Sequence, residues 1–196
     1  MKDLPLFPLG TVLFPGGLLP LRIFEQRYLE MAKACLKDGT PFGVCLIREG
    51  SEVGTPATHE PVGCLARITQ WDMQQLGLLQ VVAQGGERFR VASEQVRGDG
   101  LIIGEVEVLP EPADSPIEER HGACVRLLER IVAEHGERLF ARPFRMESSA
   151  WVGARLAEVL PLPAAMRQKL MELDDHLQRL DILQRLLSQP AAPRAG

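Results

Sequence analysis

The rhythm of hydrophobic and polar positions changes once along this chain. Up to residue 109, apolar residues form short runs or alternate with polar ones, which is typical of β-strands. Beyond the segment 110–114 they recur every three to four residues, which is typical of amphipathic helices. The pattern predicts an α+β protein with a β-rich part at 1–110, a helical part at 111–188 and a disordered tail at 189–196.

The first apolar stretch, residues 4–21, carries no charge but contains four prolines and three glycines. A proline inside a helix costs about 3 kcal/mol, so this stretch is neither a membrane span nor a signal helix. We expect it to be extended and buried, with strands over 4–9 and 11–14. A cytoplasmic location without membrane contact follows from this prediction.

Two periodicities continue through the first part. Apolar residues at Phe24, Tyr28, Met31, Ala32 and Cys35 predict a helix over about 24–37 with one apolar stripe facing inward. Further strands are predicted over 42–47, 63–70, 78–84, 88–91 and 102–108, with an irregular segment at 48–61 and turns at 71–73, 85–86 and 98–100. Several short strands at close spacing, with a single early helix, indicate a small open barrel or a sandwich.

The second part contains several helix boundaries. Ser115, with Pro116 after it and Glu118 three residues on, forms a capping box that predicts a helix start. Gly136 ends that helix, Ser148 or Ser149 caps the next one, and Met166 and Leu170 mark a third. Asp175, with Gln178 three residues on, begins a fourth. Together these helices form a C-terminal bundle.

Composition narrows the range of ligands. Acidic residues outnumber basic ones 26 to 22, giving a net charge of −4, whereas a nucleic-acid-binding surface is basic. The cysteines at 35, 45, 64 and 124 are far apart and form no C-x-x-C pair, so we expect buried thiols and neither disulfides nor a metal site. No nucleic acid, metal or cofactor is therefore expected as a ligand.

The sequence also lacks the usual signatures of catalysis. It contains no G-x-x-x-x-G-K-[ST] loop for nucleotide phosphates and no G-x-S-x-G turn for a serine nucleophile. Ser148 and Ser149 precede an apolar helical stripe, which favours capping over catalysis. His59 lies in a predicted loop without a nucleophile partner. We therefore expect no catalytic residue and a protein that is not an enzyme.

Several segments together resemble a known family. They are LPLFPLGTVLFPGGLLPLRIFEQRYLEM at 4–31, FGV at 42–44, VGCLARI at 62–68, GERFRV at 86–91 and LIIGEVEVL at 101–109. These motifs resemble the LON substrate-binding domain, found at the N-terminus of Lon ATP-dependent proteases and in stand-alone proteins. The resemblance implies a pseudobarrel enclosing one helix, a following helical bundle, and recognition of polypeptides. The motifs of the Lon ATPase and peptidase modules are absent from this sequence.

Two groups of residues are candidates for binding. Large apolar residues at a predicted strand end and turn are typical of a docking patch, although Trp71 packed inward fits the sequence equally well. Charged residues also interrupt the apolar motifs, either as ion pairs that fix the helix to the barrel or as a site for a peptide carboxylate. The peptide-binding candidates are Phe14, Trp71, Met73 and Leu76, and the secondary candidates are Arg22, Glu25, Arg27 and Arg88.

Three functions remain open at the level of sequence. The first is binding of an unfolded polypeptide, or of a protein partner such as a protease or chaperone. The second is a small-molecule or enzymatic site in a cleft between the β-rich and helical parts. The third is a purely structural adaptor. The sequence leaves the partner and the oligomeric state open.

Overall fold

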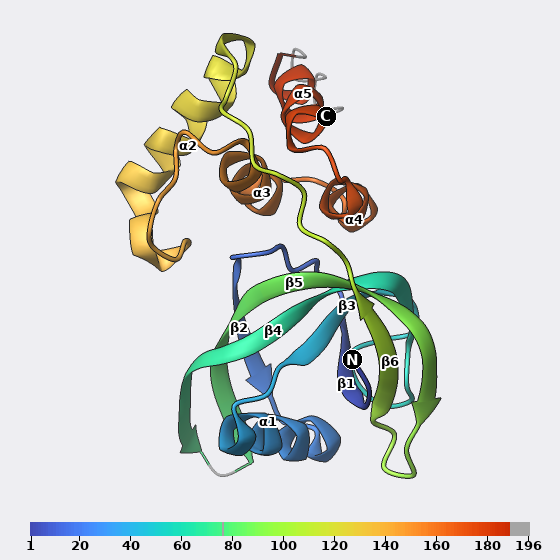
Figure 1. Ribbon diagram of the computed structural model, residues 1–196. Coiled ribbons are helices and arrows are strands. Elements are labelled where there is room, and N and C mark those ends of the chain that lie inside the picture. Colours follow the sequence, from blue (N-terminus) through green and yellow to red (C-terminus); the bar gives the residue numbers. More distant parts are fainter. Residues whose placement is uncertain (76, 189–196) are drawn as a thin grey trace, which may run out of the picture. The chain divides into compact units, whose positions relative to one another are not determined.

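The computed structural model of the protein describes residues 1–75 and 77–188 and divides the chain into two compact units (Figure 1). The strand unit comprises Met1–Glu111 and Pro163–Glu172. The helical unit comprises Pro112–Leu162 and the chain from Leu173 onward. The fold is α+β, as the sequence predicted. Each unit is described by itself below.

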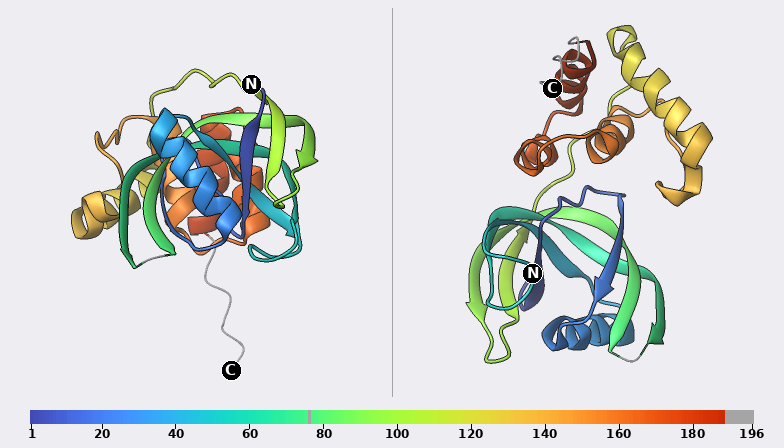
Figure 2. Two further views of the ribbon diagram at one scale, coloured as in Figure 1. Left: turned by 90° about the horizontal axis from the view of Figure 1, so that it is seen from below. Right: turned by 180° about the vertical axis from the view of Figure 1, so that it is seen from behind.

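The strand unit is built on a ring-like sheet. Its strands follow the order β2-β5-β4-β3-β1-β6, and β5 is long enough to pair with β6 as well, which closes the ring (Figures 1 and 2). The β1–β3 pair is parallel and the others are antiparallel. The expected pseudobarrel is therefore confirmed. The strands are β1 (Leu4–Leu9), β2 (Leu18–Ile23), β3 (Phe42–Glu49), β4 (Thr58–Gln75), β5 (Leu78–Val96) and β6 (Ile102–Val108).

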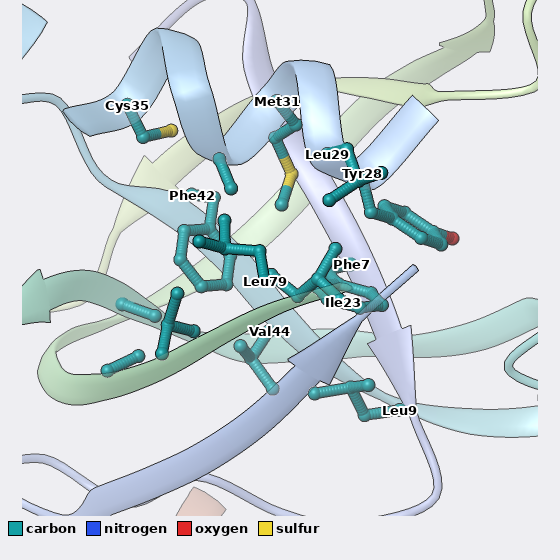
Figure 3. Packing of buried hydrophobic residues seen from close by; sticks show 14 of the residues in the cluster. Phe7, Leu9, Ile23, Tyr28, Leu29, Met31, Cys35, Phe42, Val44 and Leu79 are labelled. Atoms are coloured by element: carbon teal, nitrogen blue, oxygen red, sulfur yellow. The ribbon is translucent and has the colours of Figure 1, made fainter. Parts of the chain in front are cut away.

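One helix, α1 (Gln26–Asp38), packs its apolar stripe against the concave side of this sheet (Figure 3). The Tyr28 ring stacks on Phe7 of β1, with ring centroids 3.9 Å apart. Burial of one such side chain contributes about 1.5–3 kcal/mol, so the stripe fixes α1 to the sheet. Phe24 lies before the helix and is exposed, which corrects its predicted place in the stripe.

A second helix also belongs to the strand unit. The Gln168 side chain of α4 (Ala164–Glu172) donates its Nε2 hydrogen to the Val62 carbonyl oxygen of β4 at 2.9 Å. The sequence assigned this segment to the helical part because its apolar period is helical, and that assignment is wrong. The spacing of apolar residues predicts whether a segment is a helix or a strand, but it does not predict which part of the protein that segment packs against.

Two strand predictions were also wrong, for one shared reason. The segment Thr11–Phe14 is not a strand, and β5 runs straight through Gly85 and Gly86 instead of turning there. The loop and the strand bind each other: the Gly16 N–H donates to the Gly85 carbonyl, and the Gly85 N–H donates to the Gly17 carbonyl, both at 2.9 Å. The glycines serve close approach rather than chain reversal.

Strand β2 was missed because of Pro20. A proline cannot donate to a ladder, so it argues against a strand in the middle of a sheet. In the structure β2 is an edge strand that pairs with β5 alone, where the missing N–H has no consequence. Strand β4 begins at Thr58, inside the segment predicted to be irregular, and pairs there with β3 through shifts of register.

The helical unit packs α2 (Gly122–His135), α3 (Ser149–Val159) and α5 (His176–Ser188), with 3-10 turns at Glu119–His121 and Gly136–Arg138. The predicted caps at Ser148 and Asp175 are confirmed: their side chains accept hydrogen bonds from the Trp151 and Gln178 N–H groups. The buried apolar side chains of these helices are Cys124, Leu128, Val152, Ala154, Leu156, Ala157, Leu180 and Leu183.

The capping box predicted at Ser115 is not formed. Pro116 instead forms a β-bridge with Ser148, and the helix begins at Gly122 after the 3-10 turn. Within the part of the chain that the structure describes, no helix is long and apolar enough to cross a membrane. All four cysteines are buried free thiols.

Candidate functional site

A hairpin arm formed by the end of β4 and the start of β5 presents the first group of candidates. Its turn contains Gly77 with a φ of 83°, a backbone conformation that favours glycine. Trp71 lies directly opposite Val81 across the pair, so both side chains are on the same face of the sheet. Val81 is buried in the main core, whereas the Trp71 residue is 62% exposed. The arm therefore carries an apolar stripe from the core out to the surface.

Two further apolar residues lie near the end of this arm. Met73 is 38% exposed, two residues beyond Trp71. Phe24, directly after strand β2, is 58% exposed. The last residue of β2, Ile23, pairs with Leu79, which is the second residue of β5. We call Phe24, Trp71 and Met73 the hairpin patch. Large apolar residues gathered at one end of a sheet are typical of a docking surface.

The structure separates the four peptide-binding candidates. Trp71 and Met73 are at the surface, which resolves the open question about Trp71. Phe14 is 0% exposed, because its loop folds back onto Gly85 of β5, and its predicted place in a surface patch is wrong. Leu76 lies outside the described residues. The three residues 71–73 are part of strand β4 and not a corner.

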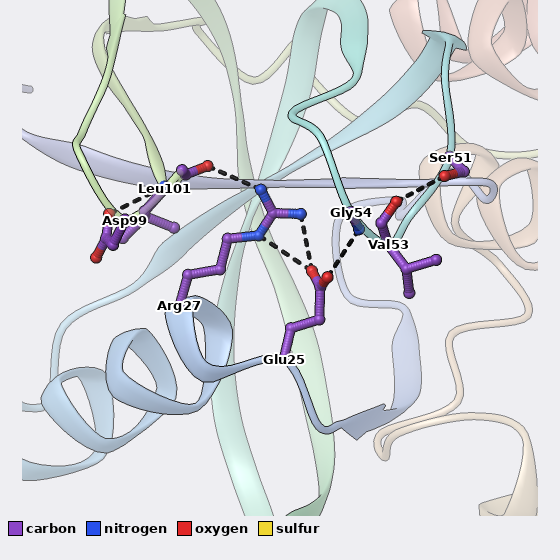
Figure 4. A network of polar contacts seen from close by, with 8 residues as sticks. Glu25, Arg27, Ser51, Val53, Gly54, Asp99 and Leu101 are labelled. Atoms are coloured by element: carbon purple, nitrogen blue, oxygen red, sulfur yellow. Dashed lines mark hydrogen bonds and ion pairs between the residues drawn. The ribbon is translucent and has the colours of Figure 1, made fainter.

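Glu25 and Arg27 form a partly buried ion pair at the start of α1 (Figure 4). The Arg27 Nη2 and the Glu25 Oε2 are 2.7 Å apart, and the second carboxylate oxygen of Glu25 accepts the Gly54 N–H at 2.8 Å. Arg27 Nη1 donates to the Gly100 carbonyl at 2.9 Å. The pair ties two loops to the helix, which is a structural role. Its ionic groups are occupied by protein atoms.

Arg88 and Arg22 have opposite environments. Arg88 on β5 is 2% exposed and donates to three main-chain carbonyl oxygens, those of Met171 and Glu172 at 3.2 Å and of Pro110 at 3.4 Å. A guanidinium suits this task because its donors diverge in a fixed plane. Arg22 on the edge strand β2 is exposed. The four charged candidates therefore do not gather into one carboxylate-binding site.

The serines and histidines that resemble catalytic groups have structural partners. Ser149 donates its hydroxyl to Asp114 Oδ1 at 3.2 Å, which also accepts the N–H groups of Ser115 and Ala150. Partial burial acts to raise the Asp114 pKa, but these hydrogen bonds, with one from Ser148, outweigh it and lower that pKa. The histidine contacts are His59 to Glu94 at 2.9 Å, His121 to Asp181 at 2.8 Å and His176 to Arg179 at 3.2 Å.

Hollows on the strand unit are shallow and charged. The larger hollow, of about 560 Å³, is lined by residues 46–52 together with Gly10, Glu60, Ala164 and Ala165. Its charged lining residues are Arg48, Glu49, Glu52 and Glu60, and it opens broadly to solvent. Among the described residues, no cluster of three or more His, Cys, Asp or Glu side chains could hold a metal ion. The hairpin patch is thus the surface with the clearest binding chemistry.

Comparison with known proteins agrees with this architecture. The family model of the ATP-dependent protease La (LON) substrate-binding domain matches residues 3–189. The chain belongs to this family. The crystal structure of a Lon N-terminal domain protein from Xanthomonas campestris is similar to this LON domain, with 37% identity and a TM-score of 0.78. The match covers 97% of this chain and 100% of that chain.

Other relatives are more distant. The N-terminal domain of a Mycobacterium avium complex Lon protease has a TM-score of 0.65 at 17% identity. The match covers 96% of this chain and 99% of that one, and at this identity it supports only the similarity of fold. Lon protease 2 of Myxococcus xanthus is 28% identical over 194 residues, 95% of this LON domain but only 23% of that protease. The chain therefore spans about a quarter of the length of such curated relatives. Cereblon of Danio rerio is 30% identical over 115 residues, 57% of this chain and 26% of cereblon.

Membership in the LON family makes this chain a substrate-binding domain by fold and sequence. The candidate that sequence reasoning missed is Phe24, which was assigned to the helix stripe. The available signal was Glu25, which stands at the N-cap position and leaves Phe24 outside the helix. The exposed faces of Trp71 and Met73 had no comparable signal, because exposure depends on how far the arm extends beyond the core.

Proposed function

We propose that this LON domain binds segments of unfolded polypeptide, or a protein partner that displays such a segment, through the hairpin patch. The observation that carries the proposal is the 62% exposure of Trp71, together with the exposure of Met73 on the same strand and of Phe24 directly after β2. Aromatic and methionine side chains are enriched at the centres of protein interfaces, and Met adapts to many partner surfaces. Binding to varied unfolded segments requires such an adaptable surface.

We further propose that binding is the whole activity of the chain. Ser148 caps a helix, Ser149 is bonded to Asp114, and His59 Nε2 lies 2.9 Å from a carboxylate oxygen of Glu94. These side chains stabilise local structure and do not form a nucleophile, base and orienting group around a common point. A role in the cytoplasm, beside a protease or chaperone, remains part of this proposal.

The test is a binding titration with fluorescein-labelled β-casein, an unfolded protein, measured by fluorescence anisotropy. We expect Trp71→Ala to weaken binding at least tenfold, which is about 1.4 kcal/mol, because interface anchors contribute on that order. The melting temperature of Trp71→Ala should stay close to that of the parent protein, since the side chain is mostly exposed.

The matched control is Val108→Ala, which removes an exposed apolar side chain from β6 of the same unit. It should bind casein like the parent protein. Equal weakening in both variants would mean that casein adheres to any apolar surface. Unchanged binding in Trp71→Ala and Met73→Ala would place the binding surface elsewhere on the LON domain.

A further inference from the structure

The two halves of strand β4 differ in their neighbours. Residues 62–66 lie between β3 and β5, and the β3 pairing ends at Ala66. The β5 pairing continues to Gln75. Among the pairings of the described residues, the other edge of 67–75 therefore has no strand beside it. Figures 1 and 2 show this last part of β4 as the outer strand of the hairpin arm in each view.

Exposure agrees with an open edge. From Thr69 to Gln75, every residue whose burial the structure describes is exposed, on both faces of the strand. An edge strand presents N–H and C=O groups on alternate residues, and another extended backbone can pair with them. Gln70, Trp71 and Asp72 keep a regular register against β5 between two shifts, so this stretch of β4 is a regular strand.

Strand β2 forms another open edge of the sheet, and its residues differ in type from those of 69–75. Strand β2 also pairs with β5 alone, and it carries Pro20 and Arg22, both exposed. Proline and positive charge are the usual features that prevent an edge from pairing with another chain. Residues 69–75 of β4 contain no proline, lysine or arginine. One edge of the fold is protected and the other is left able to pair.

We propose that the outer edge of Thr69–Gln75 accepts an extended segment of an unfolded polypeptide as an additional strand. This inference rests on the proposed function and specifies how the segment is recognised. Main-chain hydrogen bonds supply affinity that does not depend on sequence, as in other cases of strand addition. Trp71, in the regular part of this strand, contacts a side chain of the bound segment and favours an apolar residue there, and Met73 adds apolar surface at the register shift that follows.

Charge argues for this occupant over a second copy of the chain. Antiparallel pairing of two identical edges about the middle residue of 69–75 would place the two copies of Asp72 opposite each other. Like charges directly across a sheet are destabilising, and two chains of net charge −4 also repel each other at long range. A neutral or basic segment opposite Asp72 avoids both costs.

The test changes the peptide and leaves the protein intact. The probe is a fluorescein-labelled peptide of alternating valine and threonine with two lysines at each end. One derivative carries N-methyl groups on the valines and the other on the threonines. Because only one edge of a bound strand pairs with β4, one derivative should lose at least tenfold in affinity and the other less than twofold. Binding of the unmodified peptide should protect alternate amides of 69–75 from hydrogen exchange.

The outcomes separate the inference from the proposed function. If both derivatives bind like the parent peptide while Trp71→Ala still weakens casein binding, side chains alone make the site and the added strand is wrong. If both derivatives lose affinity equally, the peptide is not held by one edge. A chain that sediments as a dimer and dissociates when peptide is added would identify a second copy as the native occupant.

Discussion

Gly85 has no side chain because the Phe14 carbonyl occupies the space where a Cβ atom would lie. At the level of single residues, the sequence suggested a turn at Gly85–Gly86 and an exposed Phe14. Both expectations were wrong for this one reason. Close approach between a loop and a strand is a tertiary contact, and local sequence pattern cannot distinguish it from chain reversal.

Substitution at Gly85 should therefore be costly. We expect Gly85→Ala to lower the free energy of unfolding by about 3 kcal/mol, since the added methyl overlaps main-chain atoms that cannot move aside. Urea denaturation followed by circular dichroism measures this change. The neighbouring Gly86→Ala is the matched control, because its Cβ would lie 3.6 Å from Leu65, an ordinary contact. Similar losses in both variants would contradict the close-approach explanation.

Single residues of the candidate site were predictable to different degrees. Trp71 and Met73 could be named from their size and polar neighbours, but their exposure follows from the length of the hairpin arm. The partly buried Glu25–Arg27 pair was anticipated as one of two alternatives. Arg88 was expected either in an ion pair or in a carboxylate site; it also donates to backbone carbonyls, and these contacts could not be predicted from the side-chain pattern.

At the level of elements, helix boundaries followed the sequence when a side chain capped its own helix. Ser148 and Asp175 are examples. Prediction failed where the polar group serves a different helix. Asp114 was placed in a linker, but its carboxylate accepts the Ser149 hydroxyl and the Ala150 N–H at the start of α3. A contact over 35 residues of sequence cannot be found from a capping motif, which spans only one turn.

The Asp114 contacts predict a pH dependence. Its pKa is lowered in the folded state, so its contribution is fully present above the unfolded pKa, about 3.9, and is lost as the pH falls through the folded value. We expect Asp114→Ala to be less stable than the parent protein by about 1 kcal/mol at pH 7, the usual value of a helix-start hydrogen bond. The difference should diminish below pH 4.

Urea denaturation at pH 7 and near pH 2.5 measures this dependence. Glu129→Ala, on the exposed surface of α2, serves as the control and should show little change at either pH. A loss in Asp114→Ala that is equal at both pH values would show that the charge of the carboxylate is irrelevant.

At the level of the whole molecule, the chain passes between its two units three times, after residues 111, 162 and 172. Arg88 donates hydrogen bonds to chain segments next to two of these crossings. They are Pro110, before the first crossing, and Met171 and Glu172, before the third. The class of fold, the ring of strands and the helix within it were predictable from periodicity and family motifs. The return of α4 to the strand unit was not, because it depends on Gln168 and Arg88 meeting distant main-chain groups.

Loss of Arg88 should destabilise the chain segments near residue 110 and near residue 172 together. We expect Arg88→Ala to lower the free energy of unfolding by about 3 kcal/mol, because it leaves several buried carbonyls without this donor. Brief digestion with proteinase K should cut it near 110–112 and 172–174 faster than the parent protein. Arg90→Ala, an exposed neighbour on β5, should behave like the parent. Cleavage confined to one of the two regions would show that Arg88 does not join them.

The position of α4 has a consequence for synthesis on the ribosome. Strand β6 is complete at Val108, yet the helix that covers part of β4 ends at Glu172. Fifty or more residues of the helical unit must leave the exit tunnel before α4 can pack against the strand unit. Until then the nascent chain exposes the surface around Val62 that Gln168 later contacts. A stop codon placed after the strands would therefore produce a ring of strands without α4, with the surface around Val62 left exposed.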